Sequence, residues 1–169
     1  DATRKFYLLG RDRLIGELDP PQGGKLLEIG CGTGRNLIRA ATVWPSIEAY
    51  GVDVSSEMLA SARGAIRGHG LERRIAIAQA DATLLDPQAL FGALTFDRIF
   101  IACALSMSPP WKSVLARACG YLGEGGSLHI VDFGDQAGLP APFRFALHHW
   151  LALFSVHPCL TLEADLAEF

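Results

Sequence analysis

The residue types most able to do chemistry stand together in one short run, EIGCGTG, at positions 28–34. Its three glycines, Gly30, Gly32 and Gly34, let the backbone take positive φ values and let a ligand approach without a Cβ in the way. The helix expected to begin at Arg35 leaves free N–H groups at its start, and these favour a negative or polar ligand group. A glycine-rich turn alone is as typical of an ordinary tight turn as of a binding loop, so its meaning depends on the residues around it.

Two carboxylates farther along the chain suit an adenosine-containing ligand. Asp53 ends the second expected strand, where a carboxylate can accept hydrogen bonds from both ribose hydroxyls of a nucleoside. Asp81 ends the third expected strand, with Ala82 after it, and can accept a hydrogen bond from an adenine amino group. The glycine turn and the two carboxylates together predict an adenosine cofactor site.

The form of the turn distinguishes between adenosine cofactors. A dinucleotide site has the fingerprint G-x-G-x-x-G, whereas this sequence has the tighter G-x-G-x-G. Glu28 precedes the turn, and its carboxylate would repel phosphate but suits the cationic methionine part of S-adenosylmethionine. No Tyr-x-x-x-Lys motif follows any tyrosine, which argues against a short-chain dehydrogenase. We therefore expect S-adenosylmethionine as the cofactor.

Strand-like and helix-like stretches alternate along the chain and would position these residues. Short apolar or β-branched runs predict strands over 25–29, 47–52, 74–79, 96–101 and 127–132. Helical spacing predicts helices over 35–43, 55–67, 87–91 and 111–122, with Ser55 as an N-cap, and an amphipathic helix over 1–18. Strands joined by crossover helices imply an α/β fold with a mostly parallel sheet and helices on both faces.

Composition and charge limit the class of protein. The 169 residues, 50% hydrophobic and 20% charged, fit one globular domain and exclude a disordered, collagen-like or coiled-coil chain. A net charge of −3 gives no basic field for nucleic acid. The four cysteines lack disulfide-framework or metal-ligand spacing, so we expect free thiols and no metal site. No secretory signal opens the sequence, so a cytoplasmic location is expected.

Five motifs follow one another in register: EIGCGTG, YGVDVSSEML, AQADA, FDRIFIACALS and LGEGGSLHIVDFG. Together they resemble the class I S-adenosylmethionine-dependent methyltransferases over 25–134. The resemblance implies a Rossmann-like fold with strand order 3-2-1-4-5-7-6. The sequence starts at Asp1 without a Met and ends at Phe169 before the sixth and seventh strands could form, so we expect both ends of the chain to be incomplete. A single domain is expected over 1–169, with a helical lid at 1–24, a cofactor-binding core at 25–134 and a helical segment at 135–169.

The resemblance also implies which residues meet the cofactor. Glu28 and the glycine turn would flank the methionine part, whose ammonium would meet the backbone near Ile101 and Ala102. Arg11 on the first helix would bind the methionine carboxylate or that of an acceptor, because a guanidinium fork matches carboxylates. The remaining groups would hold ribose and adenine. The full set expected at the cofactor is Arg11, Glu28, Gly30, Cys31, Gly32, Gly34, Asn36, Asp53, Val54, Met58, Asp81, Ala82, Ile101 and Ala102.

The opening run TRKFYLLGRDRLI at 3–15, with EIGCGTGRN and HIVDFG, narrows the resemblance. It is similar to the N-methyltransferases of betaine-lipid synthesis, which trimethylate the amino group of a diacylglyceryl-homoserine head group. The resemblance implies a lipid head-group amine as acceptor. A soluble small-molecule amine, a quinone-like acceptor and a non-catalytic S-adenosylmethionine-binding module are the alternatives.

An amine acceptor must arrive neutral, because a protonated nitrogen has no lone pair with which to attack, so a base is needed. Near the expected strand ends we assign Tyr7 and Asp132 to catalysis and Arg4, Ser106 and Phe133 to the substrate. Each has a structural alternative, since Asp132 can simply cap a loop, Phe133 can pack in the core, and Arg4 can lie on a solvated helix face.

The segment 139–156 is unusually apolar and aromatic, yet it is too short and too charged to span a bilayer. Packing over the sheet is one explanation. An amphipathic helix lying at a membrane surface is the other, and it would suit a lipid acceptor. We therefore expect peripheral membrane contact through 139–156 and no integral membrane segment.

Overall fold

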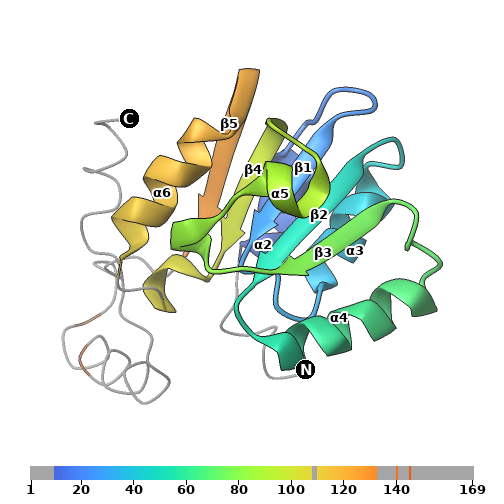
Figure 1. Cartoon of the computed structure of the whole chain (residues 1–169), viewed down its shortest axis with the longest axis horizontal. Coiled ribbons are helices and arrows are strands. Elements are labelled where there is room, and N and C mark those ends of the chain that lie inside the picture. Colours follow the sequence, from blue (N-terminus) through green and yellow to red (C-terminus); the bar gives the residue numbers. More distant parts are fainter. Residues whose placement is uncertain (1–9, 108–109, 133–139, 141–144, 146–169) are drawn as a thin grey trace.

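Five parallel strands form the centre of the computed structural model, which describes residues 10–107, 110–132, 140 and 145 (Figure 1). The strands lie in the order β3-β2-β1-β4-β5, which confirms the expected order for the first five. The expectation that the sixth and seventh strands are missing concerns residues outside the described ranges. The strands are β1 (Lys25–Ile29), β2 (Glu48–Asp53), β3 (Ile75–Gln79), β4 (Phe96–Ala102) and β5 (Leu122–Val131).

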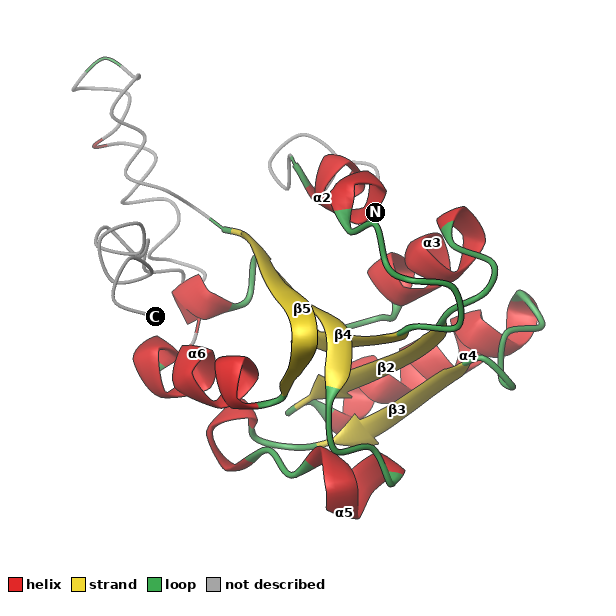
Figure 2. Ribbon diagram, turned by 90° about the horizontal axis from the view of Figure 1, so that it is seen from above, coloured by secondary structure: helices red, strands yellow, loops and turns green. Residues whose placement is uncertain are grey.

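Helices cover both faces of this sheet, as the alternation of elements predicts (Figure 2). The elements are α2 (Arg11–Glu17), α3 (Arg35–Val43), α4 (Ser56–Gly68), α5 (Pro87–Phe91), α6 (Trp111–Gly120) and the short 3₁₀ helices η1 (Ala82–Leu84) and η2 (Leu105–Met107). α2, α3 and α4 pack on one face, where Leu14, Leu37 and Leu59 share a core. α5 and α6 pack on the other, where Leu115 joins Leu27 of the sheet. The predicted Rossmann-like architecture is confirmed.

Local sequence fixes several element boundaries. The predicted bounds of β1, α3 and α5 match those observed. Ser55 caps α4 as expected, its side-chain oxygen accepting the Met58 N–H at 3.2 Å. Asp86 caps α5 in the same manner and Pro87 follows at the first helical position, where its missing N–H costs nothing.

Three predicted elements differ from those observed by more than one residue at an end. The amphipathic helix over 1–18 is wrong as one continuous element, because Gly10 adopts φ 90° and α2 begins after it. The helix predicted to reach Leu122 ends at Gly120, and β5 begins at Leu122 instead of Ser127. The cause is long-range pairing: Phe96 pairs with Leu122, and the register then shifts before Arg98 pairs with Ser127. A bulge of this kind is set by the partner strand.

Candidate cofactor-binding site

The glycine turn after β1 is bent in the way that its residues predict. Gly30, Gly32 and Gly34 have φ values of 77°, 50° and 76°. A Cβ added to Gly30 would lie 2.5 Å from the Ala104 Cβ, so this position packs too closely for any side chain. A Cβ at Gly32 would meet nothing within 4 Å. The turn therefore presents bare backbone to open space at Gly32, as a loop that receives a ligand requires.

Asp53, at the end of β2, is clamped across this turn. Its Oδ2 accepts the Gly32 N–H at 2.7 Å and its Oδ1 accepts the Ser55 N–H at 2.9 Å. A carboxylate offers about four acceptor sites, so two backbone bonds fix its orientation and leave acceptor capacity for other donors. Asp53 therefore joins the glycine turn to the start of α4 in a geometry suited to a diol.

Glu28 lies beneath the turn and is fully buried. Its Oε1 accepts a hydrogen bond from Nδ2 of Asn36 at 2.8 Å, whereas its Oε2 has no partner. Burial raises the pKa of Glu28 to about 8, against the opposing effects of the Asn36 hydrogen bond and the Arg11 charge. An unpartnered buried carboxyl oxygen is costly, so this position is built for a group that the protein alone does not supply.

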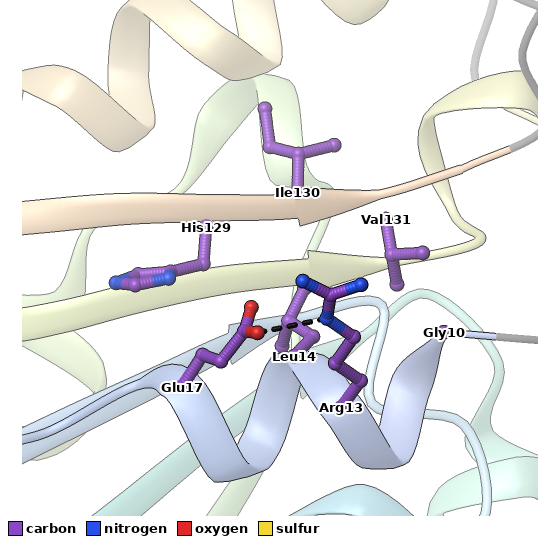
Figure 3. A pocket seen from close by; sticks show the side chains of 7 residues that line it. All are labelled: Gly10, Arg13, Leu14, Glu17, His129, Ile130 and Val131. Atoms are coloured by element: carbon purple, nitrogen blue, oxygen red, sulfur yellow. Dashed lines mark hydrogen bonds and ion pairs between the residues drawn. The ribbon is translucent and has the colours of Figure 1, made fainter.

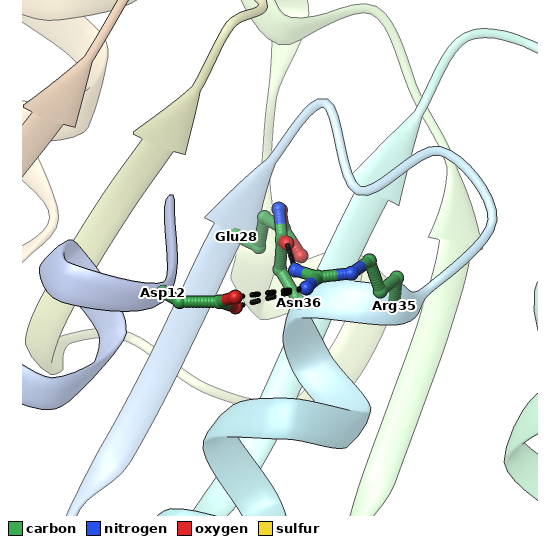
Figure 4. A network of polar contacts seen from close by, with 4 residues as sticks. All are labelled: Asp12, Glu28, Arg35 and Asn36. Carbon is green, nitrogen blue, oxygen red and sulfur yellow. Dashed lines mark hydrogen bonds and ion pairs between the residues drawn. The ribbon is translucent and has the colours of Figure 1, made fainter. Parts of the chain in front are cut away.

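A chain of polar contacts links Glu28 to α2 (Figure 4). Nη1 of Arg35 donates to Oδ1 of Asn36 at 3.2 Å, and Nη2 of Arg35 lies 3.0 Å from Oδ1 of Asp12. Asn36 thus accepts from Arg35 and donates to Glu28, which fixes the orientation of its amide. Sequence reasoning placed Asn36 at the cofactor but missed Asp12 and Arg35, whose pairing depends on how α2 packs on α3.

Arg11 of α2 is half-buried and lies in the electrostatic field of the same cluster. Burial lowers the pKa of Arg11, and the nearby Arg35 charge lowers it further, while Asp12 and Glu28 act in the opposite direction. The structure therefore brings Arg11 and Glu28 into one electrostatic cluster, as their predicted shared role at the methionine end requires.

Exposed apolar side chains lie on the segments that follow β2 and β3. Val54 is 70% exposed and Met58 38% exposed, where sequence reasoning expected an adenine surface. Leu84, 74% exposed on η1, was not anticipated. Asp81 caps η1, its Oδ1 accepting the N–H and the hydroxyl of Thr83, and these bonds lower its pKa. Asp81 thus stays ionised and oriented, with the predicted Ala82 opening the 3₁₀ turn.

The ends of β4 and β5 meet on the other side of the turn. Ile101 is buried and Ala102 half-buried at the end of β4. Cys103 then takes a φ of 57° and donates its N–H to the Val131 carbonyl at 2.7 Å. The Ser106 N–H donates to Oδ2 of Asp132 at 3.1 Å. The structure therefore brings together Ser106 and Asp132, which sequence reasoning assigned separately, and no pattern in the sequence indicated the left-handed turn at Cys103.

The comparisons with known proteins agree with this geometry. A family model described as a methyltransferase domain matches residues 21–156. The chain belongs to this methyltransferase family. Phosphatidylethanolamine N-methyltransferase of Cereibacter sphaeroides is 33% identical over 148 residues, which are 87% of this chain and 70% of that protein. The chain spans less than half the length of two other curated relatives that it matches.

Solved structures confirm the methyltransferase fold. The YcgJ protein from Bacillus subtilis superposes with a TM-score of 0.75 at 20% identity, covering 94% of this chain and 66% of that one. The [4+2]-cyclase SpnF superposes with a TM-score of 0.72 at 26% identity, covering 92% and 55%. The predicted enzyme class, an S-adenosylmethionine-dependent methyltransferase, is confirmed by family membership, and so is the cofactor.

The described residues of the methyltransferase fit this cofactor. The open backbone at Gly32 leaves room for a ligand, and the unpartnered Oε2 of Glu28 can accept from one. Carboxylates at Glu28, Asp53 and Asp81 suit a ligand that carries an ammonium, ribose hydroxyls and an adenine amino group rather than phosphates. Cys31 is buried, and burial raises the pKa of its thiol, so its contribution to the turn is its backbone.

Several predicted residues of the methyltransferase lie outside the described ranges, namely Arg4, Tyr7, Phe133 and nearly all of 139–156. Phe145, within that segment, is 77% exposed. Among the described residues, no helix is long and apolar enough to cross a membrane. In the same ranges, no three His, Cys, Asp or Glu residues are grouped so as to hold a metal ion.

A hollow of about 230 Å³ lies between α2 and β5 of the methyltransferase (Figure 3). Its lining includes Arg13, Glu17 and His129, and none of the residues predicted for cofactor or acceptor. Arg13 and Glu17 form an exposed ion pair on α2. This hollow therefore shares no residue with the predicted cofactor site at the strand ends.

Proposed function

We propose that this methyltransferase transfers a methyl group to the amine of a lipid head group, with diacylglyceryl-homoserine as the preferred acceptor. The observation that carries the proposal is the carboxylate of Asp132 at the ends of β4 and β5, because the backbone N–H of Ser106 fixes its position and a fixed carboxylate there suits an amine. The similarity to a phosphatidylethanolamine N-methyltransferase supports a lipid amine. The opening run at 3–15 supports homoserine as the head group.

In this proposal the methionine end of the cofactor lies toward Glu28 and Arg11, with its ammonium at the backbone of Ile101 and Ala102. The ribose hydroxyls donate to Asp53. The adenine lies between Val54 and Met58 and donates its amino group to Asp81. The clamped carboxylate of Asp53, held by two backbone N–H groups, supports this placement.

The cofactor supplies an electrophilic methyl group on a sulfonium. The chain must deliver a neutral amine in line with it and accept the proton that the amine loses, and such positioning accounts for much of the rate. We assign proton acceptance to Asp132 with Tyr7, and acceptor positioning to Ser106, Arg4 and Phe133. Peripheral membrane contact through 139–156 would bring a cytoplasmic enzyme to a lipid whose tails stay in the bilayer.

The test is transfer of a labelled methyl group from S-adenosylmethionine to diacylglyceryl-homoserine in mixed micelles, with phosphatidylethanolamine and a soluble amine in parallel. Asp132→Asn is the matched variant, because it keeps the shape of the side chain and removes the base. We expect label in the homoserine lipid, at least about tenfold less with Asp132→Asn, and unchanged binding of S-adenosylhomocysteine.

The other outcomes separate the alternatives. Label in phosphatidylethanolamine alone would keep the lipid-amine proposal and overturn the choice of homoserine. Label only in the soluble amine would overturn the lipid acceptor. Cofactor binding without transfer to any acceptor would favour a different reaction, as in the [4+2]-cyclase SpnF, which shares this fold.

A further inference from the structure

We propose that the carboxyl of Glu28 holds a proton in the cofactor-free enzyme and releases it to solvent when the methionine end of the cofactor binds. Glu28 then acts as a proton-linked counter-charge that selects ligands carrying an ammonium group. The proposal rests on the placement of the methionine end given under the proposed function. It adds a thermodynamic link between cofactor affinity and pH.

The Glu28 carboxyl is buried and has few hydrogen-bond donors around it. Glu28 has no exposed surface, its Oε1 has one donor and its Oε2 has none. An ionised carboxylate in such a place lacks most of the donors that water would give it, so the neutral form is favoured. The pKa of Glu28, raised by burial to about 8, agrees with this geometry.

The charged neighbours do not cancel the cost of burial. Among the described residues, those facing Glu28 are Arg11 from α2, Arg35 from α3, Asp53 from the end of β2 and the Cys31 thiol in the turn. Arg35 is already paired with Asp12, and Asp53 opposes ionisation. An arriving ammonium adds a positive charge, so the O–H bond of Glu28 breaks, the proton passes to buffer, and the carboxylate is balanced by the ligand.

Isothermal titration calorimetry tests this directly, in two buffers of different ionisation enthalpy at pH 6.5. S-adenosylhomocysteine is the probe, and 5′-methylthioadenosine, which lacks the amino acid part, is its matched control. We expect release of about one proton with the first ligand and almost none with the second. The affinity for S-adenosylhomocysteine should rise about tenfold per pH unit until about pH 8.

Two variants separate the proton link from a structural effect. Glu28→Gln should bind without proton release and with a flat pH profile. Asn36→Ala keeps the carboxyl but removes the hydrogen bond that lowers its pKa, so the midpoint of the affinity profile should move to higher pH. This second variant also serves if Glu28→Gln does not fold.

The contrary outcomes are distinct. Tight binding of S-adenosylhomocysteine by the unaltered enzyme without proton release would overturn the proton link and leave the cofactor placement standing. Equal release with both ligands, or release that persists in Glu28→Gln, would assign the proton to another group and overturn the proposal. Absence of binding by either ligand at every pH would overturn the cofactor placement itself.

Discussion

The two sides of the glycine turn are built differently. On the proposed cofactor side, at the ends of β1, β2 and β3, Asp53 and Asp81 each accept the N–H of the residue two positions ahead, and Asp53 also accepts that of Gly32, 21 residues earlier. On the proposed acceptor side, at the ends of β4 and β5, the contact between Ser106 and Asp132 spans 26 residues. The proposed cofactor side therefore combines local caps with one contact between two motifs, whereas the contact on the proposed acceptor side depends on the packing of β5 beside β4.

The largest effect is expected where the turn packs most tightly. Gly30→Ala forces an L residue to a φ of 77° and places a Cβ 2.5 Å from that of Ala104. We expect a loss of about 3–4 kcal/mol in the free energy of unfolding, measured with urea. Gly32→Ala is the matched control, because its Cβ meets nothing, and it should lose about 1 kcal/mol.

The same pair of variants also tests where the cofactor lies. Gly32→Ala projects its methyl group into the open space assigned to the ligand. The variant should therefore lose more free energy of binding to S-adenosylhomocysteine than free energy of unfolding. Equal losses of stability in the two variants would contradict the packing argument, and unchanged affinity in Gly32→Ala would contradict the ligand's position.

The next effect concerns the buried carboxyl of Glu28. Its pKa in the folded protein, raised by burial to about 8 from 4.5, means that the folded state binds this proton more tightly than the unfolded state. The resulting stabilisation is present at low pH and is lost as pH rises toward about 8. Relative to Glu28→Gln, the cofactor-free enzyme should lose on the order of 2–3 kcal/mol between pH 5 and 8.5 in urea unfolding. If the stability of the unaltered enzyme relative to Glu28→Gln stayed constant or increased with pH, the raised pKa would be contradicted.

Asp53 should come next, and its effect should appear in cofactor affinity. Asp53→Ala removes the acceptor of two backbone N–H groups and of the proposed ribose bonds, so calorimetry should show binding weaker by about 1–3 kcal/mol. Asp81→Ala should weaken cofactor binding less, because Asp81 lies on an exposed cap. The reverse ranking of the two variants would mean that adenine contacts outweigh the ribose contacts.

The contrast between local and long-range contacts also explains which features could be predicted from the sequence. The turn, the carboxylate of Asp53 and the bounds of α3 follow from local rules, because glycines, caps and hydrophobic spacing act over a few residues. The parallel order of the first five strands follows from the succession of elements and the family resemblance. The turn, the Asp53 position and α3 could be predicted because each has a short-range cause, whereas the order of the strands could be predicted only through the family resemblance.

The features that sequence reasoning missed depend on distant partners. The ion pair between Asp12 and Arg35 needs α2 packed on α3, and the early start of β5 needs pairing with β4. Cys103 takes a left-handed conformation where the chain turns beside β5, although glycine would be the expected residue. No window of sequence contains both members of such a contact.

The smallest effect is expected on the acceptor side, and its sign is informative. Ser106 is buried and its hydroxyl has no partner, so Ser106→Ala removes an unsatisfied polar group and should leave stability unchanged or raise it by about 1 kcal/mol in urea unfolding. Because we assign acceptor positioning to Ser106, KM for the lipid should also rise several-fold in this variant, while binding of S-adenosylhomocysteine stays constant. For stability alone, Asp132→Asn is the control, since it retains an oxygen for the Ser106 N–H. A clear loss of stability in Ser106→Ala would assign the hydroxyl to the core, and the acceptor side would then have to position its amine through other side chains.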